Sequence, residues 1–213
     1  MLKRFRIVGL CLMAVFAMSV VVVQAAAADG DNDVDTVNTG TFKAKLVAST
    51  NAVFKAGAFT VECSESESTA TVTTAKNKVG DTAAAKVSFS GCGLATVKTC
   101  ATGITTTYID DSGETEAVDE RLGPYDGLEN HIPAGCIKIE VAGCIIYIGP
   151  VGGGGVNELG AYDDSTGIVK FVNVTVPFST NGGFFCPAAG NGTFNAEYGP
   201  VENAGGVILR DFS

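Results

Sequence analysis

The chain contains no tryptophan and a single histidine, His131. A glycosidase needs only a pair of carboxylates, but sugar sites also use aromatic platforms, which a chain with no tryptophan and five tyrosines can hardly build. A Ser–His or Cys–His pair would have to use His131, and no G-x-S-x-G motif is present to hold a nucleophilic serine. The sequence therefore favours a non-catalytic protein over an enzyme.

Basic residues are also scarce. The chain has 14 lysines and arginines against 23 acidic residues, which gives a formal net charge of −9. A surface of this sign repels phosphate backbones and anionic lipids. We therefore expect no nucleic-acid partner and no binding to anionic membranes.

The N-terminus has the pattern of a secretory signal. Three basic residues precede an apolar run over residues 7–23, and small residues at Ala26 and Ala28 fit the cleavage rule. The run is nearly long enough to span a bilayer, but acidic residues follow it, not a basic stop-transfer cluster. We predict a helical signal peptide over residues 1–28, no membrane span after its removal, and a secreted or cell-surface location.

The rest of the chain divides into a short leader and one domain. Residues 29–40 are rich in aspartate and lack an apolar period, so they are expected to be a disordered acidic leader. Their aspartate spacing is similar to the start of a calcium loop, but Val34 stands where that loop needs glycine and Gly40 where it needs glutamate. Residues 41–213 are predicted to form a single domain.

Apolar and polar residues alternate with a period of two throughout residues 41–213, and no helical stripe is present. This pattern predicts an all-β fold, an antiparallel β-sandwich or barrel of about ten short strands stapled by disulfides. In one strand, the alternation places Val172, Val174, Val176 and Phe178 on the inner face, and Pro177 indicates an edge or a bulge. The predicted strands lie within residues 41–49, 58–63, 68–74, 84–90, 103–109, 136–149, 170–178, 192–198 and 206–212.

Removal of the signal also removes Cys11, and an even number of cysteines in an exported chain predicts a disulfide framework. Structural zinc is disfavoured because no C-x-x-C motif occurs. The pattern of residues 136–149 predicts two strands joined by an Ala-Gly turn. The two cysteines of this hairpin would not lie directly opposite each other, so each is expected to form a disulfide with a different partner. Six cysteines allow 15 disulfide connectivities. Of the three pairs favoured here, the first is indicated by the parity of its two strands, and the other two are indicated by exclusion and chain order. The pairs are Cys63–Cys92, Cys100–Cys136 and Cys144–Cys186.

The glycine run at residues 152–155 could in principle cradle phosphate groups. Such a loop needs a helix after it and usually a nearby lysine, and neither follows here before Lys170. We interpret the run as a flexible hairpin connection.

The longest polar segment, residues 110–127, carries seven acids with Arg121 as its only base. We expect a solvated loop, although its charge would attract cations or a basic partner. Asp110, Asp111, Glu114 and Glu116 are weak candidates for calcium binding. The remaining acids are Asp119, Glu120 and Asp126.

Several motifs suggest relatives. A strand ending in "VECSES", the strand "VSFSGC", the cysteine pair in "CIKIEVAGCIIYIG" and the late "CPAAGNGTFNAEYGP" follow one another in the mature chain. This arrangement resembles a group of uncharacterised exported proteins of soil actinobacteria. The resemblance implies an extracytoplasmic β domain and offers no catalytic residues and no cofactor.

The sequence therefore predicts a secreted or cell-surface, non-catalytic binding or structural β domain, with an unidentified protein or cell-surface ligand as partner. The alternative is an extracellular hydrolase or a calcium-dependent module that uses the acidic segment at residues 110–126. No cofactor is expected in either case.

Overall fold

The computed structural model describes residues 33–34, 40–72, 77–78, 82–109, 126–149, 152–163, 165–184 and 186–209. The regular elements in these ranges are all β-strands, and no helix among them is long and apolar enough to cross a membrane. The predicted signal peptide lies outside the described residues. The strands are β1 (Asp33–Val34), β2 (Gly40–Lys45), β3 (Ala52–Ala56), β4 (Phe59–Cys63), β5 (Glu65–Val72), β6 (Asn77–Lys78), β7 (Thr82–Ser90), β8 (Thr96–Thr99), β9 (Ile104–Ile109), β10 (Asp126–Ile132), β11 (Ile137–Val141), β12 (Cys144–Ile148), β13 (Val156–Asp163), β14 (Ile168–Gly182), β15 (Gly190–Tyr198) and β16 (Glu202–Asn203).

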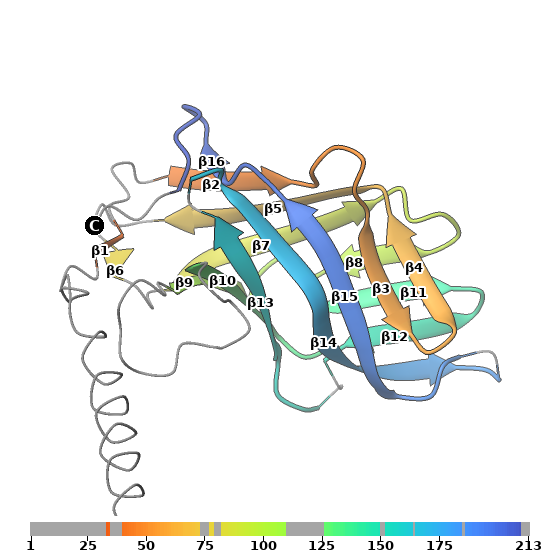
Figure 1. Ribbon diagram of the computed structural model, residues 1–213. Coiled ribbons are helices and arrows are strands. Elements are labelled where there is room, and N and C mark those ends of the chain that lie inside the picture. The colour runs from red at the N-terminus through yellow and green to blue at the C-terminus, as the bar shows by residue number, and fades with distance from the viewer. Residues whose placement is uncertain are drawn as a thin grey trace, which may run out of the picture.

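Fourteen of these strands form one antiparallel sheet that curls around a common interior (Figure 1). The long strand β14 organises the curl because it has β15 on one side and two successive neighbours on the other. Its first part pairs with β13 and its last part with β12. At the end of β2, the backbone N–H of Val47 donates to the carbonyl of Glu197 in β15, so two distant parts of the sheet meet there. The all-β, antiparallel prediction is confirmed.

Three disulfides staple the sheet. Cys63–Cys92 joins the end of β4 to the residues after β7, Cys100–Cys136 joins the end of β8 to the start of β11, and Cys144–Cys186 joins β12 to the β14–β15 connection. These are the pairs that the sequence favoured. Disulfides of this number are typical of proteins in an oxidising compartment.

The β11–β12 hairpin forms as predicted, with Val141 opposite Cys144. Its two turn residues, Ala142 and Gly143, have φ values of 46° and 77°. Positive φ at both central positions is the geometry of a type I′ turn, whose twist matches that of the flanking strands. Cys136 and Cys144 accordingly lie at different places in the ladder and bond to different partners.

The prediction that Val172, Val174, Val176 and Phe178 all face the interior is wrong for Val172. Val172 is 69% exposed, whereas Phe171, Val176 and Phe178 are buried. The cause is a bulge between Phe171 and Val174, where Asn173 adopts a φ of 51° and the register with β15 shifts. The extra residue shifts the alternation by one place. Before the bulge an odd-numbered residue, Phe171, points inward, and after it even-numbered residues, Val176 and Phe178, do so.

Pro177 lies in β14, a central strand and not an edge. The strand nevertheless lacks a ladder partner on one side at this point, because pairing with β13 ends at Lys170 and pairing with β12 begins at Phe178. The Pro177 carbonyl accepts a hydrogen bond from Gly149 on that side. A proline nitrogen in this gap removes no ladder hydrogen bond.

The segments near the two ends of the described chain differ from the simple expectation. Asp33 and Val34 pair with β6, although they fall in the expected disordered leader; the leader's other residues before Gly40 lie outside the described part. At the C-terminus, Ile208 forms only an isolated bridge with Glu202, so the strand predicted over residues 206–212 does not form within residues 206–209.

Gly160 in β13 lets an aromatic ring lie directly against the backbone. A Cβ at this position would be 2.6 Å from Val169 Cγ2 and 2.9 Å from Phe171 Cε1. We expect Gly160→Ala to lower the free energy of unfolding by about 1–3 kcal/mol, as overpacking a core does. Urea denaturation measures the change. Gly154→Ala is the matched control because an added Cβ there meets nothing within 4 Å; equal losses in the two variants would contradict the explanation.

Candidate functional site

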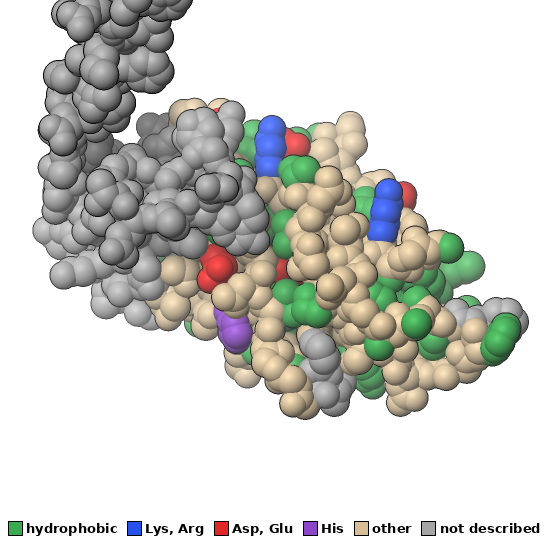
Figure 2. Space-filling model, turned by 60° about the horizontal axis from the view of Figure 1, so that its bottom comes forward, with side chains coloured by type: hydrophobic (Ala, Val, Ile, Leu, Met, Phe, Trp, Pro, Cys, Tyr) green, Lys and Arg blue, Asp and Glu red, His purple; other side chains and the backbone are tan. Residues whose placement is uncertain are grey.

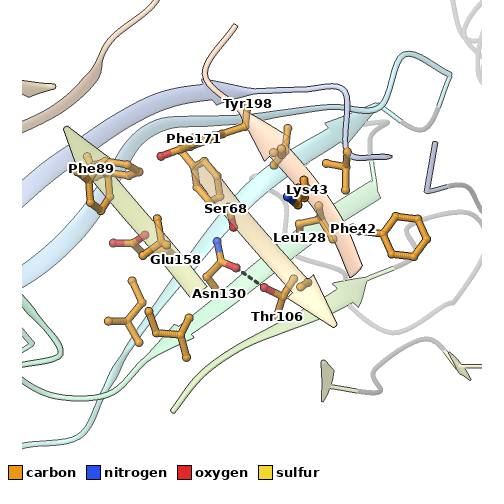
Figure 3. A pocket seen from close by; sticks show the side chains of 18 of the residues that line it. Phe42, Lys43, Ser68, Phe89, Thr106, Leu128, Asn130, Glu158, Phe171 and Tyr198 are labelled. Atoms are coloured by element: carbon orange, nitrogen blue, oxygen red, sulfur yellow. Dashed lines mark hydrogen bonds between the residues drawn. The ribbon is translucent and has the colours of Figure 1, made fainter. Parts of the chain in front are cut away.

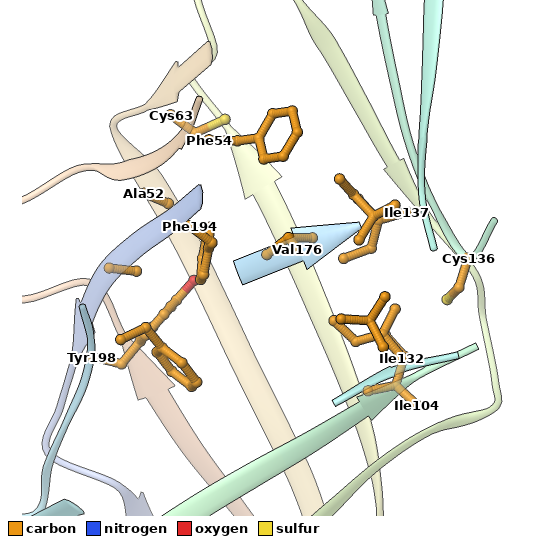
Figure 4. Close-up of a cluster of buried hydrophobic side chains, with 14 of the residues drawn as sticks. Ala52, Phe54, Cys63, Ile104, Ile132, Cys136, Ile137, Val176, Phe194 and Tyr198 are labelled. Carbon is orange, nitrogen blue, oxygen red and sulfur yellow. The ribbon is translucent and has the colours of Figure 1, made fainter. Parts of the chain in front are cut away.

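The interior of the curled sheet contains two neighbouring cavities, of about 60 and 40 Å³. The larger one lies among residues of β2, β9 and β10, and the smaller one lies among residues of β3, β4 and β11. Apolar side chains converge on this region from many strands (Figure 4). The two cavities share four lining residues: Phe89, Ile137, Glu158 and Phe194.

A continuous run of aromatic rings forms one wall of the larger cavity. Phe89 packs edge-on against Phe194 at 6.5 Å between ring centroids, and Phe194 contacts Phe171 at 5.9 Å. Phe171 in turn meets Tyr198 edge-on at 6.1 Å. Each such pair adds about 0.5–1.5 kcal/mol beyond the burial of its area, so this wall is a rigid part of the core.

A row of polar side chains in the same cavity crosses three adjacent strands. Thr106 in β9 lies opposite Asn130 in β10, and Asn130 lies opposite Glu158 in β13. The Thr106 hydroxyl donates to Asn130 Oδ1 at 2.6 Å. Figure 3 shows Thr106, Asn130 and Glu158 side by side in the cavity, with Ser68 above Asn130. Polar groups therefore enter an otherwise apolar interior at one defined place.

Glu158 is the exceptional member of this row. It is 7% exposed, one of two polar residues buried in the described chain. Within the described residues, its carboxyl forms no hydrogen bond or ion pair, and burial alone raises its pKa from 4.5 to about 7. An unpaired buried carboxyl is costly to maintain, because desolvation disfavours its charged form and its neutral form lacks a partner.

The second buried polar group is satisfied. The Ser66 hydroxyl lies 2.8 Å from the Tyr198 hydroxyl and donates to the carbonyl of Ser88 at 2.7 Å. Burial, with a smaller effect from the charge of Glu158, raises the pKa of the Tyr198 phenol. Tyr198 is thus a neutral, anchored neighbour of the cavity at physiological pH.

Most residues singled out from the sequence do not lie at this site. The calcium candidates Asp110, Asp111, Glu114 and Glu116 lie outside the described residues, and of the acidic segment up to Asp126 only that last residue is described. The described part contains no cluster of three or more His, Cys, Asp or Glu side chains suited to a metal ion. His131 is exposed on the outer face (purple in Figure 2), where its Nδ1 lies 2.7 Å from Asn157 Oδ1.

The interpretation of the glycine run as a hairpin connection is wrong. It leads from β12 to β13, and these strands pair with different parts of β14 and not with each other. At the end of the run, a Cβ on Gly155 would lie 2.5 Å from the His131 ring, so the connection passes closely over β10.

Sequence reasoning did not find Glu158. The period-two alternation of residues 156–162 could have revealed it, because it puts Glu158 on the same face of the strand as Val156 and Tyr162, which are both buried. A glutamate on the apolar face of a strand is unusual, but Leu159 and Gly160 interrupt the alternation and hide it.

Three comparisons with known proteins complete this description. No family model, no curated protein and no solved structure matches the chain. The inference of function therefore depends on the geometry of this interior site.

Proposed function

We propose that the chain is an exported, non-catalytic binding domain that holds a small ligand inside its curled sheet. The observation that carries the proposal is the Glu158 carboxyl, which is buried without a partner between two cavities. Buried polar groups are almost always paired, and an exception calls for an explanation such as water or a ligand. A ligand that satisfied Glu158 would offset the cost of burying it.

Several features support the extracytoplasmic part of the proposal. Three disulfides fit an oxidising compartment, and the basic, apolar and small-residue segments of residues 1–28 fit a cleaved signal. The resemblance to exported actinobacterial proteins points in the same direction. We therefore place the domain outside the cytoplasm, secreted or at the cell surface.

The alternative functions, a hydrolase or a calcium-dependent module, depend on the acidic segment at residues 110–126. The structure describes only Asp126 of that segment, as the first residue of β10. No observation on the described residues favours this alternative, whereas the interior site is built from residues that are described in full.

The proposal predicts that small molecules enter the interior. Methyl-labelled protein is titrated with a panel of alcohols, ketones and amines of about two to six non-hydrogen atoms and followed by NMR. We expect saturable shift changes concentrated on Ile104, Leu128 and Val169, which line the larger cavity. Ala70→Leu, which fills space in the same lining, should weaken these changes. A panel that leaves the interior methyls unchanged contradicts the proposal.

A further inference from the structure

The chemistry of the interior suggests what kind of ligand it holds. Among the described residues that line either cavity, Glu158 is the only acidic one. Lys43, the one basic residue among the described lining residues, is exposed and forms no ion pair with Glu158. None of the described residues therefore provides a positive charge to pair with the Glu158 carboxylate.

The surroundings of Glu158 suit the nitrogen of an amine. A hydrogen bond between an ammonium and a carboxylate is about twice as strong as a neutral one. Aromatic rings also attract cations, and Phe89 and Phe194 line both cavities together with Glu158. Figure 3 shows Phe89 on the same side of the larger cavity as Glu158. A net charge of −9 favours the approach of cations over anions.

The volumes limit the ligand to a compact molecule. A single water molecule requires about 10–15 Å³ of such space, so cavities of about 60 and 40 Å³ each accept a few groups of that size. The lining beyond Glu158 is mainly apolar, with Ile104, Leu128 and Val169 in one cavity and Val61, Ile139 and Val176 in the other. A short alkyl chain fits these walls better than a second polar group.

We propose that the two cavities bind a compact aliphatic amine, with its ammonium on the Glu158 carboxylate and its short alkyl group against the apolar walls. This proposal depends on the proposed binding function and specifies its ligand class. Glu158 would then act as the charge-recognition residue, and the aromatic wall would hold the alkyl group.

The test compares three probes that each have three carbon atoms but differ in charge: propylamine, 1-propanol and propionate. Each is titrated into the wild-type protein at pH 8 and constant ionic strength, with methyl NMR and thermal melting as readouts. Four non-hydrogen atoms limit the dissociation constant of the amine to about 50 μM at best, so the titration extends to tens of millimolar. We expect propylamine to bind at least tenfold more tightly than 1-propanol, and propionate not to bind.

Two variants test whether the Glu158 carboxyl is the group that binds the amine. Glu158→Gln keeps the shape of the side chain and removes its charge, so it should abolish the preference for the amine. Glu62→Gln is the matched control because Glu62 is an exposed carboxyl on β4 and lines neither cavity; it should bind as the wild type does. Loss of binding in both variants would mean general attraction of cations to an acidic protein and would overturn the inference.

The pH dependence gives an independent readout. Alkyl ammonium groups stay charged below pH 8, as lysine does, whereas Glu158 has a pKa of about 7. The affinity for propylamine should fall about tenfold per pH unit below pH 7 and level off above it. Among the described lining residues, Tyr198 and Lys43 are the other titratable ones, and burial raises the Tyr198 pKa away from this window.

The outcomes separate the two proposals. Equal binding of propylamine and 1-propanol, retained in Glu158→Gln, would overturn the amine inference and leave a neutral-ligand binding domain. Interior methyls that respond to no probe would mean that the cavities hold water only, and both proposals would then be wrong.

Discussion

Replacing Cys63 and Cys92 together by alanine should lower the free energy of unfolding by about 4 kcal/mol. The bond closes a loop with a sequence separation of 29, and restricting a loop of that length in the unfolded chain gives an effect of this size. The end of β4, which pairs with β3 alone, is held to the residues after β7 by this bond and by a hydrogen bond from the Ser64 N–H to the Gly91 carbonyl. Urea denaturation of the oxidised variant and the wild type measures the loss.

The Cys100–Cys136 bond provides a matched comparison. It closes a loop of similar length, with a sequence separation of 36, so its removal should cost nearly as much global stability. Its two ends are also held by the β8–β11 ladder, in which Ile137 lies opposite Thr99. Faster hydrogen exchange confined to β3 and β4 is therefore expected only without Cys63–Cys92. A stability loss below about 1 kcal/mol, or equal exchange in both variants, would contradict this assignment.

The fold was predictable where the alternation is uninterrupted. Residues 59–63 and 85–89 carry apolar and polar residues in strict alternation, and both stretches lie in strands, β4 and β7. The alternation misplaced Val172 because a single bulge residue changes the parity of everything on one side of it, and nothing local marks Asn173 as that residue. Pro177 indicated an edge or a bulge in this stretch. The stretch does contain the bulge between Phe171 and Val174, but it is not an edge, since a strand can be central in the sheet and still lack a partner on one side for a few residues.

The candidate site was less predictable than the fold. Glu158 is one of 23 acidic residues, and its importance comes from the curl of the sheet, which makes residues of β7, β13 and β15 line the same two cavities. Phe89 and Phe194 join Glu158 in these linings only through this tertiary arrangement. The sequence instead drew attention to the densest acidic segment, because local charge is visible in a sequence and burial of a single charge is not.

Burial of Glu158 should make stability depend on pH in a direction opposite to ordinary acid denaturation. Its pKa is about 7 in the folded protein and close to the usual glutamate value when the chain is unfolded. Below the unfolded pKa both states are protonated, and the contribution of Glu158 to stability is fully present. As pH rises from about 4.5 to about 7, the unfolded state loses its proton first, so this contribution falls by about 3 kcal/mol and then levels off.

Glu158→Gln should remove this dependence because a glutamine does not titrate. The variant and the wild type should have similar free energies of unfolding at pH 4.5, and the variant should be more stable by about 3 kcal/mol at pH 8. Urea denaturation across this range, without added amine, measures the difference, and subtracting the two curves cancels the contributions of the other carboxyls. Glu62→Gln should run parallel to the wild type because its carboxyl is exposed. A constant difference between the wild type and Glu158→Gln at all pH values would mean that Glu158 has the same pKa in the folded and unfolded states, which would contradict the effect of its burial.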